Sequence, residues 1–362
     1  MAHPTPAHPT PASSSDRPTG RAGEPVASRR SPASSGTPGL IRVAAVVDGS
    51  LREAQDDAAI QRLPEWLRQP NASVWIDLAG PSPGQVDAVG DVLGLHPLIV
   101  EDVLEGNQRA KIETTDGLVH LVLFALDRSD QVAVNEIDLV LSVGYLLTVH
   151  GREWDPRHSH HLGTGAGLTA IMARGPDHLL WAISDDIVDG YFPYADRLGD
   201  AIDAVQDAVI AKATPDTLES LFALKRELIE VRRAASPTRE VFNQLTNRDI
   251  QLIDPEELVY FRDVYDHVIR LTDEMDNYRE LASSTLDVYL TQVNNNLSVI
   301  MKRLTGVTVI LAGVGAIAGI FGMSEAGTAF SGSEAGGFWL VTGASIAMAV
   351  VAVAVLRRID WI

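Results

Sequence analysis

A stripe of small and polar residues follows one face of an expected helix in the C-terminal third of this chain. Its members alternate in steps of four and three residues, which places them near one face of a helix. They are Asp287, Thr291, Asn294, Ser298, Met301, Thr305, Thr308, Ala312, Gly315, Gly319 and Gly322. A small and hydroxylic face that begins at a carboxylate suits a water-filled path for cations between parallel helices. Tight helix packing through small residues is the alternative interpretation.

Other patterns that could carry chemistry are few. The run from His158 to His161 contains three imidazoles that could bind zinc or nickel, or simply form an exposed turn, because their spacing does not match one helix face. The absence of cysteine excludes disulfides and thiolate metal sites. No nucleophile with a base, glycine-rich phosphate loop or metalloprotease motif stands out, so we expect no enzyme activity.

Two apolar runs surround the end of the stripe. They span Leu304 to Met323 and Phe338 to Leu356, and neither contains a charged residue. Each is about 20 residues long, which as a helix is enough to cross a bilayer core. Helices satisfy their own backbone hydrogen bonds in lipid, so we expect a transmembrane hairpin.

Basic residues flank this hairpin at both outer ends. Lys302 and Arg303 precede the first run, and Arg357 and Arg358 follow the second. Positive charge at both ends predicts that both termini are cytoplasmic and that the protein lies in the cytoplasmic membrane. Residues 324–337 then form an external loop and residues 357–362 a cytosolic C-terminus.

The first membrane run continues an unusually long helical pattern. Asp254 and Pro255 form a start signal with Glu257, and no proline follows, nor any glycine before Gly306. Apolar residues recur in steps of mostly three and four from Phe261 onward, which predicts one buried seam. We expect a helix of about 100 Å, comprising a stalk over residues 251–303 and a pore-lining membrane helix over residues 304–323. Such a stalk needs neighbours, so several copies are expected around an axis.

The rest of the chain indicates a disordered tail and an α+β domain. Residues 1–38 are rich in Pro, Ala, Ser, Thr and Gly and lack an apolar core. Residues 39–250 alternate β-rich and helical patterns and are expected to form a cytosolic α/β/α domain with a helical extension. The expected strands are Leu40–Val47, Val74–Leu78, Leu118–Leu126, Asn135–Val143 and Tyr145–Val149. The expected helices are Pro83–Leu93, Pro97–Leu104, His178–Val209, Asp216–Ala235 and Ser236–Asn247.

The net charge of −19 bears on partners. It argues against nucleic acid as a partner, because nucleic acid attracts a basic surface. It agrees with a protein that gathers cations, and solubility alone would also explain it.

Several segments together resemble the CorA-type divalent-cation channel family over residues 40–362. LGLHPLIVEDVLEGNQRAKIE resembles the stretch before its central strands, and IVDGYFP resembles its interdomain helix. YFRDVYDHVIRLTDEMDNYRE is similar to its stalk, and LDVYLTQVNNNLSVIMKRLT with AGIFGM is similar to its pore helix. The resemblance implies a homopentamer in the lipid bilayer that passes Mg²⁺, with cobalt or nickel as substitutes, and needs no organic cofactor.

The resemblance also implies sites. The family carries a Gly-Met-Asn signature at the outer mouth, where this chain has Gly322, Met323 and Ser324, and it often has Asn where this chain has Ser298. Both departures replace an amide by a hydroxyl and bear on ion selectivity. Apart from the resemblance, Asp287 lies on the stripe just below the membrane run, where five copies would form a negative ring.

Regulation by intracellular magnesium is a further implication. Asp102 and Asp263 match one ion-sensing pair between neighbouring domains, with Glu101 and Asp185 as second-site members. Carboxylates that face each other repel until a divalent ion neutralises them, so low magnesium would loosen the ring and open the pore.

Two alternatives accompany this interpretation. One is a zinc transporter resembling the ZntB branch. That branch carries Gly-Ile-Asn in its signature, and this chain has Met323 at the position of the Ile. The other is a non-conducting, magnesium-sensing membrane pentamer, which Ser324 keeps open.

Overall fold

A single mixed sheet organises the N-terminal half of the protein. The computed structural model describes residues 39–106, 109–115, 117–126, 134–163, 165–247, 250–322 and 334–358. Its strands are β1 (Leu40–Val47), β2 (Ser50–Gln55), β3 (Ser73–Ala79), β4 (Lys111–Thr115), β5 (Leu118–Leu126), β6 (Val134–Ser142) and β7 (Tyr145–His150). They lie in the order β2-β1-β3-β7-β6-β5-β4. Only the β3–β7 pair is parallel among these described strands.

Three short helices cover one face of the sheet. They are α1 (Asp56–Leu67), α2 (Pro83–Leu93) and α3 (Pro97–Glu105). Side chains alternate across a strand, so Val74 and Ile76 of β3 pack under these helices while Trp75 faces the other way. Leu63 of α1 and Ile99 of α3 complete this smaller core.

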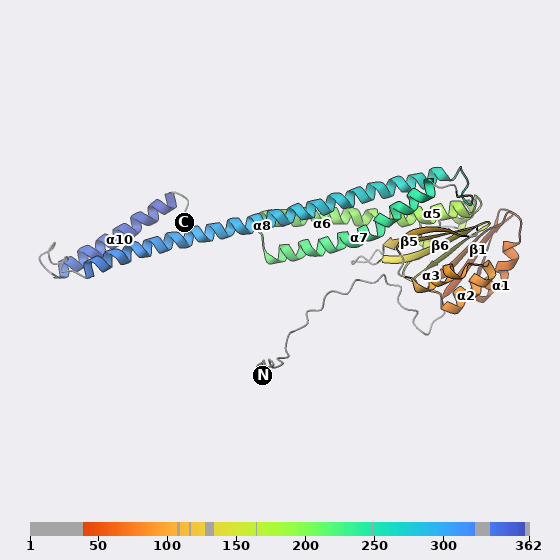
Figure 1. The fold of residues 1–362 in the computed structure, drawn as a ribbon, viewed down its shortest axis with the longest axis horizontal. Coiled ribbons are helices and arrows are strands. Elements are labelled where there is room, and N and C mark those ends of the chain that lie inside the picture. Colours follow the sequence, from red (N-terminus) through yellow and green to blue (C-terminus); the bar gives the residue numbers. More distant parts are fainter. Residues whose placement is uncertain are drawn as a thin grey trace, which may run out of the picture.

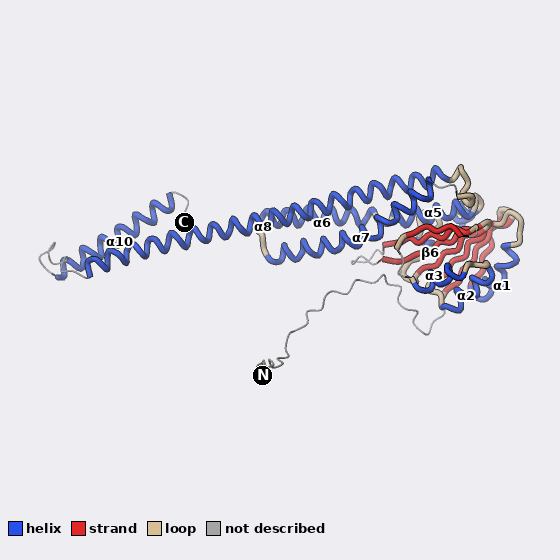
Figure 2. The backbone as a smooth tube through the Cα atoms, viewed as in Figure 1, coloured by secondary structure: helices blue, strands red, loops and turns tan. Residues whose placement is uncertain are grey.

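A second set of helices covers the opposite face, where the larger core lies. They are α4 (Gly165–Met172), α5 (Pro176–Asp189), α6 (Phe192–Ala211) and α7 (Pro215–Asn247), and the short 3₁₀ helix η1 (Pro156–His158) precedes them. With the first stretch of α8 (Leu258–Gly322), they make a three-layer α/β/α arrangement, as Figures 1 and 2 show. The α+β fold class expected from the sequence is confirmed.

Helix α8 (Leu258–Gly322) leaves this layer and extends far beyond it. Its 65 residues correspond to about 100 Å of helix. It packs against α5, α6 and α7 near its start and against α10 (Glu334–Arg358) near its end. Figure 1 shows α10 returning along α8, which brings the C-terminal end back toward the stalk.

The seam expected along this helix is buried only where partners are present. Phe261, Val264, Val268, Leu271, Met275, Ala282 and Tyr289 are buried. Val293, one step further along α8, is exposed. The sequence pattern therefore continues beyond the contacts that a single chain supplies.

Two of the expected helix boundaries are wrong. The stretch from His178 to Val209 is two helices, α5 and α6, because Gly190 ends the first and Pro193 opens the second. The expected break at Ser236–Pro237 is absent, and α7 continues through it. The residues around the proline are well packed: Ala234 and Ala235 belong to the larger core, and Thr238 is buried beside them. The free energy gained by this burial outweighs the cost of a proline inside the helix.

Candidate functional site

The polar stripe lies on an uncovered face of α8. Every stripe member from Asp287 to Gly319 is exposed in the single chain. α10 covers a different face, where Gly306 is buried and a Cβ on Gly313 would lie 3.7 Å from the Met348 Cε. The stripe and the surface that packs against α10 are therefore distinct faces of α8.

Hydroxyl groups on the stripe have a fixed role in hydrogen bonding. The Thr291 Oγ1 donates to the Asp287 carbonyl at 2.8 Å, the Ser298 Oγ to the Asn294 carbonyl at 2.9 Å and the Thr308 Oγ1 to the Leu304 carbonyl at 2.8 Å. Each hydroxyl hydrogen is thus engaged by the helix, and the oxygen lone pairs remain as acceptors. Such a face suits water molecules that point their hydrogens outward from a cation.

The surface around the stripe is apolar and exposed. Leu304 and Leu311 leave 62% and 66% of their surface open, and Leu297 and Ile300 are similarly exposed. Within the described parts of the chain, α8 is the one helix whose length and hydropathy fit a membrane crossing. That Phe338–Leu356 also crosses stays a prediction, although these residues lie within α10.

The expected filter is only partly described. Gly322 is the last residue of α8, and Met323 and Ser324 lie outside the described residues. Met301, Thr305, Gly315 and Gly319 lie within α8, and their role in a pore stays a prediction.

The proposed sensing residues Asp102 and Asp263 lie on opposite layers of one chain. Asp102 is half-buried in α3, whereas the Asp263 side chain, on α8, is 72% exposed. The sheet separates these two helices, so one chain does not bring the pair together. A shared ion would require a second chain. Glu101 is exposed beside Asp102 on α3.

Asp185 lies instead with the start of α8. Asp185, Asp189 and His267 bring one ligand atom each within 4.8 Å of one another. The His267 Nε2 also lies 4.0 Å from Asp263 Oδ2. Burial raises the pKa of Asp185, partly opposed by a 3.0 Å hydrogen bond with the His161 Nε2. Asp189 and His267 were not among the residues expected from the sequence, although they lie four residues after Asp185 and Asp263, respectively.

A second group surrounds Asp102. The Lys111 Nζ lies 2.5 Å from Asp102 Oδ2 and 3.3 Å from Glu113 Oε1. Burial alone would lower the pKa of Lys111, but its hydrogen bonds to the two carboxylates raise it on balance. Asp102 therefore already has a cationic partner, Lys111, within its own chain. This ion pair was not expected from the sequence.

Comparison with known proteins gives a consistent result. The family model described as "CorA-like Mg2+ transporter protein" matches residues 70–358. The cobalt/magnesium transport protein CorA of Thermotoga maritima is 33% identical over 265 residues, or 71% of this chain and 75% of the relative. The CorA protein of Methanocaldococcus jannaschii is 23% identical over 290 residues, or 80% of this chain and 91% of the relative.

A solved structure has the same fold. The complete structure of the CorA magnesium transporter from Methanocaldococcus jannaschii superimposes with a TM-score of 0.69 at 21% identity. The match covers 90% of this chain and 99% of that one, so the α+β domain, the long helix and their connection are shared.

Proposed function

The chain belongs to the CorA-like Mg²⁺ transporter family, and from this premise we propose that it is a membrane channel for divalent cations with magnesium as its main substrate. Cobalt and nickel are further substrates of the same path. The observation that carries the proposal is the exposed stripe from Asp287 to Gly319, which α10 leaves uncovered along the apolar end of α8. Among proteins similar to this chain, the named activities are those of transporters rather than enzymes.

Magnesium chemistry fits such a stripe. Mg²⁺ loses its bound water reluctantly, so a path that accepts the hydrated ion avoids a large dehydration cost. Bound water presents hydrogens outward, and the oxygens of Thr291, Ser298 and Thr308 are free to accept them. Asp287 adds a negative charge at the cytosolic end of the stripe and concentrates cations there.

A ring of identical chains completes the path. One stripe cannot enclose water, and the exposed Leu304 and Leu311 need apolar surroundings. We propose a homopentamer in the cytoplasmic membrane, with α8 inside, α10 outside and both termini in the cytoplasm. The pairs Lys302–Arg303 and Arg357–Arg358 support this orientation. The native mass of the detergent-solubilised protein tests the number of chains.

Regulation by intracellular magnesium completes the proposal. Asp102 of one chain and Asp263 of the next would share an ion, with Glu101 and Asp185 nearby as second-site members. Their position on opposite layers of one chain supports a site between chains. Carboxylate oxygens are the ligands that Mg²⁺ prefers.

Ion flux into liposomes tests the transport proposal. The purified chain is expected to admit Mg²⁺ without an energy source, and Asp287→Asn is expected to lower the flux about 2- to 10-fold, because its charge no longer concentrates cations. Glu219→Gln removes an exposed carboxylate from α7, away from the stripe, and is expected to leave flux unchanged.

The outcomes separate the alternatives. A correctly assembled wild type that admits zinc but not magnesium supports the zinc transporter, and one that admits neither supports the non-conducting pentamer. Unchanged flux in Asp287→Asn moves the path away from the stripe.

A further inference from the structure

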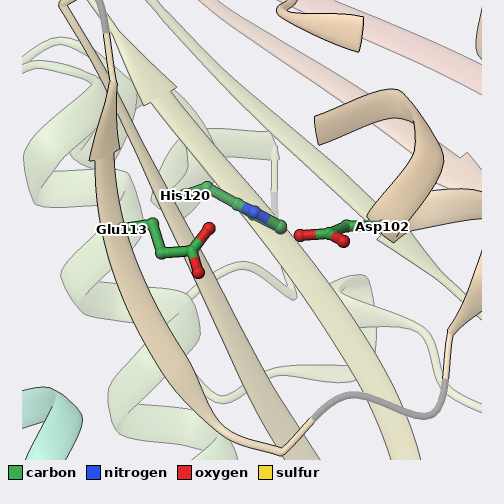
Figure 3. A group of neighbouring side chains, drawn as sticks. All are labelled: Asp102, Glu113 and His120. Carbon is green, nitrogen blue, oxygen red and sulfur yellow. The ribbon is translucent and has the colours of Figure 1, made fainter. Parts of the chain in front are cut away.

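Three elements meet around Asp102 in a way that the proposed function does not use. Asp102, Glu113 and His120 place one ligand atom each within 4.8 Å of one another. Figure 3 shows the His120 ring between the carboxylates of Glu113 and Asp102. Glu113 of β4 and His120 of β5 are directly paired in the sheet, so both side chains lie on the same face, and α3 brings Asp102 over them.

The second observation is the unused nitrogen of His120. The His120 side chain is 1% exposed, and its Nε2 lies 3.0 Å from the Asp138 Oδ1. Its Nδ1 is buried and has no hydrogen-bond partner among the described residues. An unpaired buried polar atom costs free energy, so it calls for an explanation.

This arrangement is the one that prepares a histidine to bind a metal. When a carboxylate accepts a hydrogen bond from the N–H of one ring nitrogen, the other nitrogen presents its lone pair. Metal-binding histidines are commonly held in this way by an outer carboxylate. Asp138 has that position here, and Nδ1 is the ligand atom left available.

Lys111 occupies the place of a cation in the same group. Its ammonium lies between Asp102 Oδ2 and Glu113 Oε1, at 2.5 and 3.3 Å. Two carboxylates that already share a positive charge can exchange it for a divalent ion, since the ion neutralises both. The lysine stem is flexible, so the ammonium can withdraw while the chain keeps its fold.

We propose that Asp102, Glu113 and the Nδ1 of His120 bind a first-row transition-metal ion such as zinc or cobalt within one chain, and that the ion displaces the Lys111 ammonium. An imidazole ligand favours these metals over magnesium, which prefers oxygen. The ligand atoms of a tetrahedral metal site lie about 3.3 Å apart. The ligand atoms of these three residues lie within 4.8 Å of one another, so they must move closer together to bind the ion. Glu113, whose side chain is 53% exposed, has the freedom to close this gap.

The site has a consequence for regulation that rests on the proposed function. An ion held here occupies Asp102, and Asp102 is then less available to an ion shared with a neighbouring chain. A transition metal would thus act on the magnesium sensor from inside a chain. Metal binding itself does not depend on transport and is tested separately.

The test is a cobalt titration of the full-length chain in detergent, followed by visible absorption and calorimetry in excess Mg²⁺. All variants carry His267→Ala, which removes the imidazole from the group of Asp185, Asp189 and His267. We expect one cobalt per chain with a ligand-field band of a nitrogen-containing site. Glu113→Gln is expected to weaken binding at least about tenfold, and Lys111→Met to strengthen it, because the competing ammonium is gone. Glu105→Gln, an exposed carboxylate of α3 outside the group, serves as the matched control.

The gain from Lys111→Met is the decisive result, because general damage to the fold would not tighten binding. His120→Phe is expected to abolish the band, and Glu113→Gln covers the case in which that variant fails to fold. No band in the His267→Ala parent, or equal affinity in the parent, Glu113→Gln and Lys111→Met, overturns the site. Flux plays no part in the measurement, so failure of the transport proposal leaves this result interpretable.

Discussion

At the scale of single residues, the most constrained charge is Asp77 of β3. Its carboxylate accepts hydrogen bonds from the Arg42 Nε at 2.8 Å and the Thr148 Oγ1 at 2.5 Å, and its Oδ1 lies 2.9 Å from the His150 Nε2. Arg42 also donates two bonds of 2.8 Å to Asp155, which lies in the loop after β7. The network therefore joins β1, β3 and β7 to this loop.

Breaking this network should destabilise the cytosolic domain. Asp77→Ala leaves Arg42 and His150 buried without their shared carboxylate, and such a loss costs about 3–5 kcal/mol. We expect a clearly lower Tm for the detergent-solubilised variant. The exposed Asp87 of α2 provides the control, and Asp87→Ala should change stability by no more than about 0.5 kcal/mol. Equal Tm values for the two variants would contradict the role assigned to Asp77.

Acid should remove the same stabilisation. Burial alone would raise the pKa of Asp77, but the hydrogen bond and charge of His150 and the charge of Arg42 hold it below its usual value. A carboxylate with a lowered pKa in the folded state stabilises that state above about pH 4 and loses this contribution as the pH falls through the folded pKa. Tm measured from pH 7 to pH 3 should fall more steeply in the wild type than in Asp77→Asn. Parallel curves would argue against this linkage.

At this scale, the sequence indicated the acidic residues but not the side chains that contact them. The family resemblance indicates Asp102, Asp185 and Asp263, and their roles stay predictions. It does not indicate Lys111 and His120, because β-sheet pairing and the docking of α3 bring these two residues to Asp102. A single sequence does not display such pairing, whereas helical spacing of four could have revealed Asp189 and His267.

At the scale of elements, continuous apolar runs were the most reliable signal. β1, β5 and β7 were predicted within one residue of their observed ends because they are buried on both faces. The edge strands β2 and β4 were not predicted, since their sequences SLREAQ and KIETT are mostly polar and partly exposed. Tertiary packing also carried α7 through Pro237, which local propensity does not anticipate.

The contact between α6 and α8 depends on a missing side chain. A Cβ on Gly199 of α6 would lie 2.5 Å from the Tyr278 Oη and 3.0 Å from its Cζ. The Tyr278 hydroxyl donates to Glu274 Oε1 at 2.7 Å, and the rigid ring cannot retreat without losing this bond. Close packing of the two helices therefore requires glycine here.

Gly199→Val should separate these helices and destabilise the stalk by about 1–3 kcal/mol, the usual cost of overpacking. The loss should exceed the gain in helix propensity from removing glycine, which is below about 1 kcal/mol. Tm of the detergent-solubilised protein reports the effect. Gly84→Ala in α2, where a Cβ meets open space, should leave Tm unchanged or higher. A smaller effect of Gly199→Val in a Tyr278→Ala background would identify Tyr278 as the obstacle.

At the scale of the whole molecule, a single chain leaves much of the surface of α8 uncovered. The α/β/α domain closes its own two cores, but α8 continues well past them with an apolar surface on one side and a polar stripe on another. The sequence pattern predicted both of these faces. We propose that neighbouring chains cover them, and the pattern of one helix does not reveal such contacts.

The proposed magnesium sensing is the property that most directly depends on assembly. Asp102 and Asp263 lie on helices at opposite faces of the sheet, so an ion that joins them must join two chains. Magnesium should then hold neighbouring cytosolic domains together and slow proteolysis of the full-length protein. In Asp102→Ala/Asp263→Ala this protection should fall several-fold, while Asp87→Ala/Glu219→Ala, which removes two exposed carboxylates elsewhere, should retain it.

The measurement is the digestion rate of the detergent-solubilised protein against magnesium concentration. The Asp102 variant also releases Lys111, which then adds positive charge near the site, so Asp263→Ala alone is measured beside the double variant. If Asp263→Ala shifts the magnesium midpoint as far as the double variant, the two carboxylates act through one shared ion. If magnesium protects all variants equally, the ion that stabilises the ring is bound elsewhere, and the Asp185, Asp189 and His267 group becomes the next site to test.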